Sequence, residues 1–151
     1  MTYSTEAPDT TTRYWLSVVS REHVQHAVDL GIAQVNHGKK TPLQRMCPGD
    51  GLVYYSPRER MSDGAPIKSF TAIGTIAEGE PWQADEGSFQ PWRRTVSYRG
   101  DVRQLPIDEL RSVLDLTSNP NYGMILRRGL VELSEHDFRS ISDAMGGRSE
   151  P

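Results

Sequence analysis

The chain has 151 residues, of which 36% are hydrophobic and 25% charged, with a formal net charge of -3 and a single cysteine. Its length corresponds to one domain of roughly 100–200 residues, and its aromatic and apolar content argues against global disorder. One cysteine excludes an intramolecular disulfide and a zinc site built from several cysteines. The negative net charge argues against a protein that binds polyanions over its whole surface.

No apolar run approaches the roughly 18 residues that cross a bilayer. The first residues carry neither the basic nor the apolar stretch of a secretory signal. We therefore expect a cytoplasmic protein that makes no contact with a membrane. The Thr-rich residues 1–12 and the Gly-containing residues 147–151 predict flexible tails around one domain over residues 13–146.

The first elements follow from local signals. Residues 14–19 are rich in aromatic and β-branched side chains and predict a strand. Ser20 is a good N-cap and Gly31 a good C-terminal stop, so they bound an amphipathic helix over residues 21–30. The remaining strands are expected at residues 32–36, 52–56, 69–76, 92–98 and 129–133. Gly74 suggests a bulge or a bend inside its strand.

Two more helices are expected near the C-terminus. Pro106 suits the first turn of one, whose apolar stripe includes Ile107 and Leu110. Ser134 caps the last helix, and Asp137 is placed to complete a capping box. Strands and helices do not alternate regularly, which disfavours a doubly wound parallel sheet. The pattern predicts an α+β fold, an open β-barrel of about six mostly antiparallel strands with short flanking helices.

Positive charge is confined to two parts of the chain. Residues 37–60 and residues 92–105 each have a net charge of +3, and both contain aromatic side chains. If the two segments meet in space, they form a basic, aromatic face that attracts phosphates by charge and bases by stacking. The alternative is that these lysines and arginines are ordinary solvated side chains.

Nothing in the sequence points to catalysis. It contains no glycine-rich phosphate loop. His23 and His26 share a helix face, but no further metal ligand has suitable spacing. Cys47 has no helix N-terminus behind it to activate the thiol, and the adjacent Asp85 and Glu86 need not point into one cleft. We expect a protein that is not an enzyme and holds neither a cofactor nor a metal.

The aromatic residues divide into core and surface candidates. Trp15 lies inside an apolar strand and is expected in the core. Trp82 and Trp92 follow prolines in polar surroundings, so a core position and an exposed stacking platform are both open. Tyr54 and Tyr55 are adjacent in a strand, so one is expected to face out if the other faces in.

Several short motifs occur together in a fixed order: Tyr14-Trp15-Leu16, Ser20-Arg21-Glu22-His23-Val24, His37-Gly38-Lys39, Pro48-Gly49-Asp50, Tyr54-Tyr55-Ser56-Pro57-Arg58, Phe70-Thr71-Ala72-Ile73-Gly74 and Pro91-Trp92-Arg93-Arg94. In this order the chain resembles the EVE-domain proteins, in particular their bacterial single-domain branch, over nearly all of residues 13–145. The resemblance implies a PUA-like fold related to the YTH domains, which hold a methylated RNA base in an aromatic cage.

The same resemblance implies a function. It points to a non-catalytic module that takes a modified base such as 5-methylcytosine into an aromatic pocket floored by Tyr55 and Trp92, in DNA more than in RNA, beside a restriction-type nuclease partner. The implied ligand-binding residues are Ser20, His37, Lys39, Tyr55, Ser56 and Trp92. The implied phosphate rim is Arg58, Arg60, Arg93 and Arg94.

Two other functions stay open from the sequence. One is a PUA-like domain, either a binding domain or an enzyme, that takes a free nucleobase, nucleotide or other small ligand. Such a domain would need the pocket but not the basic rim. The other is an interaction module that pairs with a second copy through an exposed strand edge. For oligomeric state we expect a monomer or a weak dimer.

Overall fold

The computed structural model describes residues 11–146. The expected tails at residues 1–12 and 147–151 lie outside the described residues, apart from Thr11 and Thr12. The strands are β1 (Tyr14–Val18), β2 (Ile32–Ala33), β3 (Gly51–Arg58), β4 (Pro66–Ile76), β5 (Trp82–Gln83), β6 (Trp92–Tyr98), β7 (Leu105–Pro106) and β8 (Leu130–Leu133). The α-helices are α1 (Arg21–Leu30), α2 (Lys40–Gln44), α3 (Asp115–Ser118), α4 (Tyr122–Leu126) and α5 (Glu135–Met145). Two short 3₁₀ segments are η3 (Asn36–Gly38) and η4 (Ile107–Leu110).

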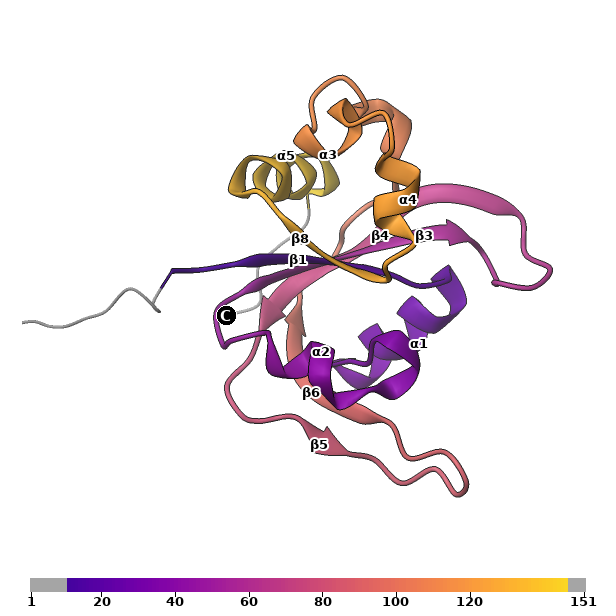
Figure 1. Cartoon of the computed structure of the whole chain (residues 1–151), viewed down its shortest axis with the longest axis vertical. Helices are drawn as coiled ribbons and strands as arrows, with labels where there is room; N and C mark the ends of the chain where they lie inside the picture. The colour runs from indigo at the N-terminus through magenta and orange to yellow at the C-terminus, as the bar shows by residue number, and fades with distance from the viewer. Residues whose placement is uncertain (1–10, 147–151) are drawn as a thin grey trace, which may run out of the picture.

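The strands form one curled sheet in the order β2-β6-β4-β3-β1-β8, with β5 added to β6 and β7 added to β4. The β1–β3 pair is parallel and the other pairs are antiparallel. Helices α1 and α2 lie on one side of the sheet and α3, α4 and α5 on the other (Figure 1). This half-barrel with short helices confirms the predicted α+β open barrel. Within the described residues, every helix is too short or too polar to cross a membrane.

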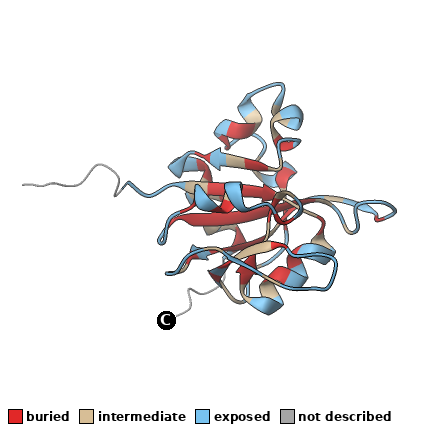
Figure 2. Cartoon of the chain, turned by 60° about the horizontal axis from the view of Figure 1, so that its bottom comes forward, coloured by how far each residue is buried: buried red, intermediate tan, exposed pale blue. Residues whose placement is uncertain are grey.

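Both faces of the central strands are buried (Figure 2). Trp15 belongs to the core under α1 and α2, whereas the next residue, Leu16, belongs to the core under α3–α5. Tyr54 and Tyr55 divide in the same way, and their exposed fractions are only 1% and 5%. The prediction that one tyrosine faces solvent was therefore wrong, because helices cover the sheet on both sides. The core position of Trp15 is confirmed.

Helix α1 begins and ends where its caps predict. The Ser20 hydroxyl accepts a hydrogen bond from the His23 backbone N–H at 3.4 Å, and Gly31 ends the helix with a left-handed φ of 68°. Strand β2 stops after two residues, instead of reaching residue 36 as predicted. A strand could not have reached residue 36, because Asn36 and His37 adopt left-handed backbone angles that no strand accommodates.

Gly74 has a different role from the one predicted. The β3–β4 pair has two register shifts, one between Tyr54 and Tyr55 and one between Ser56 and Arg58, so neither lies at Gly74, which pairs with Leu52. Glycine is needed at position 74 because a Cβ there would lie 2.5 Å from the carbonyl oxygen of Ser97 on β6. The close approach of two strands selects this residue.

Only one of the two hydrogen bonds of the predicted capping box forms at the start of the last helix, α5. The Ser134 hydroxyl accepts from the Asp137 backbone N–H at 3.1 Å, as a cap should. The Asp137 carboxylate does not reach back to complete the box. It instead accepts from the backbone N–H groups of Asp115 at 2.6 Å and Leu116 at 2.9 Å, at the start of α3. Asp137 therefore joins α5 to α3, a helix that the sequence did not predict.

Asp50, in the turn before β3, is a buried carboxylate held by N–H donors. It accepts from the Trp15 indole at 2.9 Å, from the Cys47 backbone at 2.9 Å and from the Arg13 backbone at 3.1 Å. Bonds to a charged acceptor are stronger than neutral ones, so this residue fixes the turn to the start of β1.

Candidate functional site

The connection between β2 and α2 is a strained backbone segment. Asn36, His37 and Gly38 follow one another with left-handed φ values of 47°, 63° and 82°. Asparagine and histidine are among the few non-glycine residues that tolerate this region. Such conformations cost about 1–3 kcal/mol each and cluster at functional sites. We call residues 36–38 the left-handed turn.

One side of the left-handed turn packs against the start of β6. A Cβ at Gly38 would lie 2.6 Å from the Cβ of Pro91 and 3.4 Å from the ring of Phe89. Just beyond the turn, the Lys40 ammonium lies 4.5 Å from the centre of the Trp92 ring. The two basic, aromatic segments of the sequence therefore do meet, and Lys40 and Trp92 are one of their contacts.

The other side of the left-handed turn contacts the start of β8. A Cβ at Gly129 would lie 2.4 Å from the Asn36 side-chain oxygen, and Gly129 itself has a left-handed φ of 84°, which favours glycine. The Gly129 carbonyl accepts from the Val18 backbone N–H at 2.9 Å, at the end of β1. Hence the turn lies between β6 and the end of β1. Ser20 follows that end of β1 closely in sequence. We call this turn, with Lys40, Pro91, Trp92 and Gly129, the turn site.

Four of the six predicted ligand-binding residues lie on the α1–α2 side of the sheet. The side chains of His37 and Lys39 are exposed and make no hydrogen bond or ion pair with any part of the chain that the structure describes. Trp92 is half-buried against the core under α1 and α2. Ser20 is buried at the start of α1, where it acts as the N-cap.

Tyr55 is not close to these residues. Its ring packs edge-on against Phe70, with 5.7 Å between ring centres, in the core under α3–α5. Burial, with a smaller contribution from Tyr122, raises the pKa of Tyr55 to about 12. The structure therefore does not bring Tyr55 and Trp92 together as the floor of one pocket. Ser56 is also buried, and its hydroxyl lies 2.8 Å from that of Thr71.

The four predicted rim arginines do not form one rim. Arg94 is buried, with only 4% of its surface exposed, and donates to backbone carbonyls on two loops. Arg93 donates to the Gln34 side chain at 2.8 Å and pairs with Glu86. On the β3–β4 hairpin, Arg60 pairs with Asp63 at 3.1 Å. Arg58, on the same hairpin, donates to the Gly64 carbonyl at 3.0 Å.

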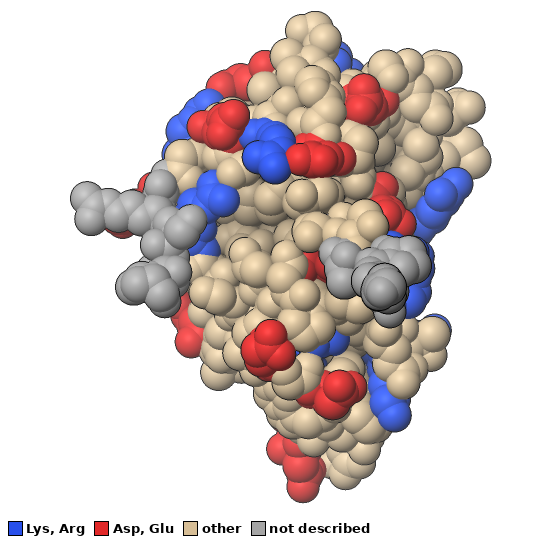
Figure 3. All heavy atoms as spheres, turned by 90° about the vertical axis from the view of Figure 1, so that its left-hand side faces the viewer, with Lys and Arg blue, Asp and Glu red and all other residues tan. Residues whose placement is uncertain are grey.

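Charge around the fold is mostly balanced, as Figure 3 shows for one face, on which acidic and basic side chains are interspersed. The turn site differs, because Lys39 and Lys40 have no carboxylate partner among the described residues. Sequence reasoning selected Lys39 and missed Asn36 and Lys40. The sequence signal for this turn was the run Asn36-His37-Gly38, since these residue types are among those that adopt left-handed backbone angles most readily.

A recess lies elsewhere, between α1 and the β3–β4 hairpin. It is an open groove of about 440 Å³, and the residues that line it are Arg21, Glu22, Gln25, His26, Asp29, Glu59 and Arg60. Arg21 and Glu59 form an ion pair at 2.8 Å across it. The groove has no aromatic surface on which a planar ligand would stack, so the turn site is the better candidate.

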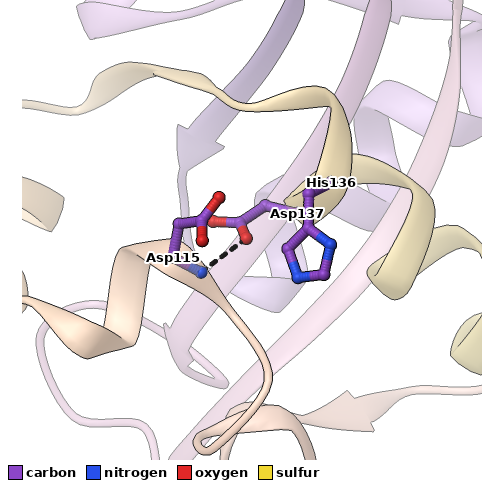
Figure 4. Close-up of side chains that lie close together, drawn as sticks. All are labelled: Asp115, His136 and Asp137. Carbon is purple, nitrogen blue, oxygen red and sulfur yellow. Dashed lines mark hydrogen bonds between the residues drawn. The ribbon is translucent and has the colours of Figure 1, made fainter.

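Asp115, His136 and Asp137 bring their side chains together at the start of α5, with one potential ligand atom of each within 4.8 Å of the others (Figure 4). Hydrogen bonds within the protein account for this cluster. The Asp137 carboxylate caps α3, and the Ser134 hydroxyl donates to Asp115 at 2.8 Å. The His136 Nε2 lies 2.9 Å from the Val113 carbonyl. These contacts describe a junction between helices.

This junction predicts a pH-dependent stability. The hydrogen bond to the Val113 carbonyl, with smaller contributions from Asp115 and Asp137, raises the pKa of His136 above its usual 6.5. The stabilisation is fully present below the unfolded-state pKa of about 6.5 and is lost as pH rises through the folded-state value. We expect His136→Gln to lower the urea midpoint at about pH 5.5 and to leave it nearly unchanged at about pH 8.5. The matched variant His26→Gln, on the exposed face of α1, should show no such pH dependence of the urea midpoint. An equal loss of stability for His136→Gln at both pH values would contradict the role given to His136.

The fold defines a class of small α+β domains built on a curled half-barrel sheet. The YTH domain of the Zygosaccharomyces rouxii MRB1 protein, solved in complex with N6-methyladenosine RNA, aligns with a TM-score of 0.58 at 16% identity, over 97% of this chain and 94% of that one. A hypothetical protein from Leishmania major aligns with a TM-score of 0.55 at 13% identity, over 87% of this chain and 93% of that one. At these identities the likeness concerns the fold alone.

Sequence similarity identifies the family within this class. The EVE domain profile matches residues 13–144. A UPF0310 protein of Renibacterium salmoninarum is 51% identical over 132 residues, which cover 87% of this chain and 94% of the relative. The chain belongs to the EVE-domain family, which confirms the resemblance drawn from the motifs.

Proposed function

We propose that the chain is a non-catalytic nucleic-acid-binding module that recognises a modified base at the turn site. The observation that carries this proposal is the left-handed turn itself, a strained segment packed against Pro91. Two lysines follow it; Lys40 lies over the Trp92 ring, and neither lysine has a carboxylate partner within residues 11–146. The YTH domain that shares the fold was solved with methylated RNA, which supports a nucleic-acid ligand.

The aromatic surface at the turn site suits a planar base. Phe89, which is 42% exposed, and the half-buried Trp92 both border the turn. Lys40 covers the Trp92 ring, and a cation on an exposed ring contributes only about 0.5–1 kcal/mol. A stacked base contributes roughly 1–3 kcal/mol. A base can therefore displace the Lys40 ammonium from the ring, and the ammonium is then free to meet a phosphate.

The half-buried Asn36 and the exposed His37 provide hydrogen-bonding groups for a base edge. Asn36 offers an amide with both donor and acceptor atoms, and His37 offers a ring nitrogen of each kind when neutral. Flipping a base out of a duplex costs a few kcal/mol, so stacking and edge contacts together have to offset that cost. A single-stranded ligand avoids it.

The test is a binding panel measured by fluorescence anisotropy with the wild-type chain. It contains matched oligonucleotides with 5-methylcytosine in DNA, N6-methyladenine in DNA, N6-methyladenosine in RNA, and no modification. We expect a preference of about tenfold or more for one modified oligonucleotide, which corresponds to about 1.4 kcal/mol. Equal affinity for all members would contradict base recognition, and absence of binding to any of them would contradict the nucleic-acid function.

A further inference from the structure

Two arginines beside the turn site have no partner among the residues that the structure describes. Arg127 and Arg128 follow α4 and are exposed. Their side chains make no hydrogen bond, ion pair or ring contact with the residues described, 11–146. Most other arginines of that range are neutralised by a carboxylate, namely Arg13, Arg21, Arg60, Arg93, Arg103, Arg111 and Arg139.

The position of this pair is fixed by the next residue. Gly129 contacts Asn36 of the left-handed turn and accepts a hydrogen bond from Val18 at the end of β1. The α4–β8 connection accordingly lies beside the end of β1 (Figure 1). Lys39 and Lys40 follow the turn directly on the other side. Uncompensated cations therefore flank the left-handed turn on two sides, on a chain whose net charge is -3.

A free nucleoside has no phosphate to use these charges, and a free nucleotide carries its phosphates on one side of the sugar only. A nucleotide inside a strand has a phosphate on each side. We infer that Arg127 and Arg128 bind backbone phosphate, so that the ligand of the turn site is a polynucleotide strand whose backbone passes from Lys39 and Lys40 across the turn to these arginines. This inference rests on the proposed function and adds to it the path of the bound strand, from the two lysines across the turn to the two arginines.

The experiment compares the wild type with the double variant Arg127→Gln/Arg128→Gln, using the preferred oligonucleotide of the panel and the free modified nucleoside, over a series of salt concentrations. Each phosphate contact to a single strand contributes about 0.7 to the slope of log K against log salt. We expect the slope to fall by about 1.4 if both contacts are lost. Affinity for the nucleoside should stay unchanged.

The matched control is Arg111→Gln/Arg139→Gln, which removes the same charge from arginines that are already paired with Asp108 and Glu135. It should leave the slope as in the wild type. An unchanged slope in Arg127→Gln/Arg128→Gln, or an equal loss of nucleoside binding, would overturn this inference and leave base recognition standing. A wild type that binds none of the oligonucleotides would overturn both.

Discussion

Gly38→Ala is expected to bind the preferred modified oligonucleotide roughly 10- to 100-fold more weakly than the wild type, because stacking worth roughly 1–3 kcal/mol is lost. A Cβ at this position would lie 2.6 Å from the Cβ and 2.8 Å from the Cα of Pro91. A backbone atom cannot rotate away as a flexible side chain can. The left-handed turn therefore has to move off Pro91, and Asn36 and His37 move with it away from the start of β6, where Trp92 lies. The measurement is fluorescence anisotropy at a fixed salt concentration.

The control separates this displacement from simple backbone strain. Gly49 has a φ of 94°, similar to the 82° of Gly38, but a Cβ there meets nothing within 4 Å. Alanine costs about 1–2 kcal/mol of stability in such a conformation. We expect Gly49→Ala to be destabilised by about that amount and to bind like the wild type. Wild-type affinity in Gly38→Ala would show that the turn does not shape the binding site.

Local signals in the sequence predicted those elements that depend on local interactions. Helix α1 has its start signal, Ser20, and its stop signal, Gly31, in its own sequence, and its bounds are as predicted. Strand β6 alternates between polar and apolar residues and also has the predicted bounds. Helices α3 and α4 were missed because they are short and one of their caps, the Asp137 carboxylate, comes from a residue 22 positions away from Asp115.

The candidate site was harder to predict because its contacts are long-range. The sequence placed His37, Lys39 and Trp92 in the site, and the structure brings the segments of these residues together. It also selected Tyr55 from a motif, but a sheet buried on both faces sends adjacent residues into separate cores. The apolar run from Leu52 to Tyr55, which has no polar alternation, is compatible with cover on both faces, but the prediction for the two tyrosines considered one covered face only.

Arg94 gives the sharpest contrast between pattern and structure. In sequence it is one of two adjacent arginines beside a tryptophan, the pattern expected of a phosphate rim. In the structure it faces inward, as Trp92 and Val96 on alternate positions of β6 do, and both lie against the core under α1 and α2. Its guanidinium donates to Met46 O at 2.8 Å and Gly79 O at 2.6 Å, which lie on two loops far apart in sequence.

Arg94→Ala is therefore expected to lower the free energy of unfolding by about 3–5 kcal/mol, because hydrogen bonds from a charged donor contribute about 1.5–3 kcal/mol each and their buried acceptors would be left unpaired. Two weaker bonds, to Leu43 O and Ala77 O, both at 3.4 Å, are lost as well. Urea unfolding followed by circular dichroism gives the value. Arg94→Lys should retain part of the stability, since one ammonium replaces a planar fork that spans both loops.

The control for this prediction is Arg139→Ala, which removes an exposed arginine from a pair with Glu135 on α5 and should leave the urea midpoint unchanged.

Binding distinguishes the two roles of Arg94. A rim arginine would weaken oligonucleotide binding and leave stability intact when it is removed, because an exposed cation contributes little to folding. Removal of a buried arginine that joins two loops instead lowers stability. The folded fraction of Arg94→Lys should then bind the oligonucleotide with the salt slope of the wild type. If Arg94→Ala had normal stability and a reduced salt slope, Arg94 would be a phosphate-binding rim residue after all. The two loops around it would then be held by other contacts.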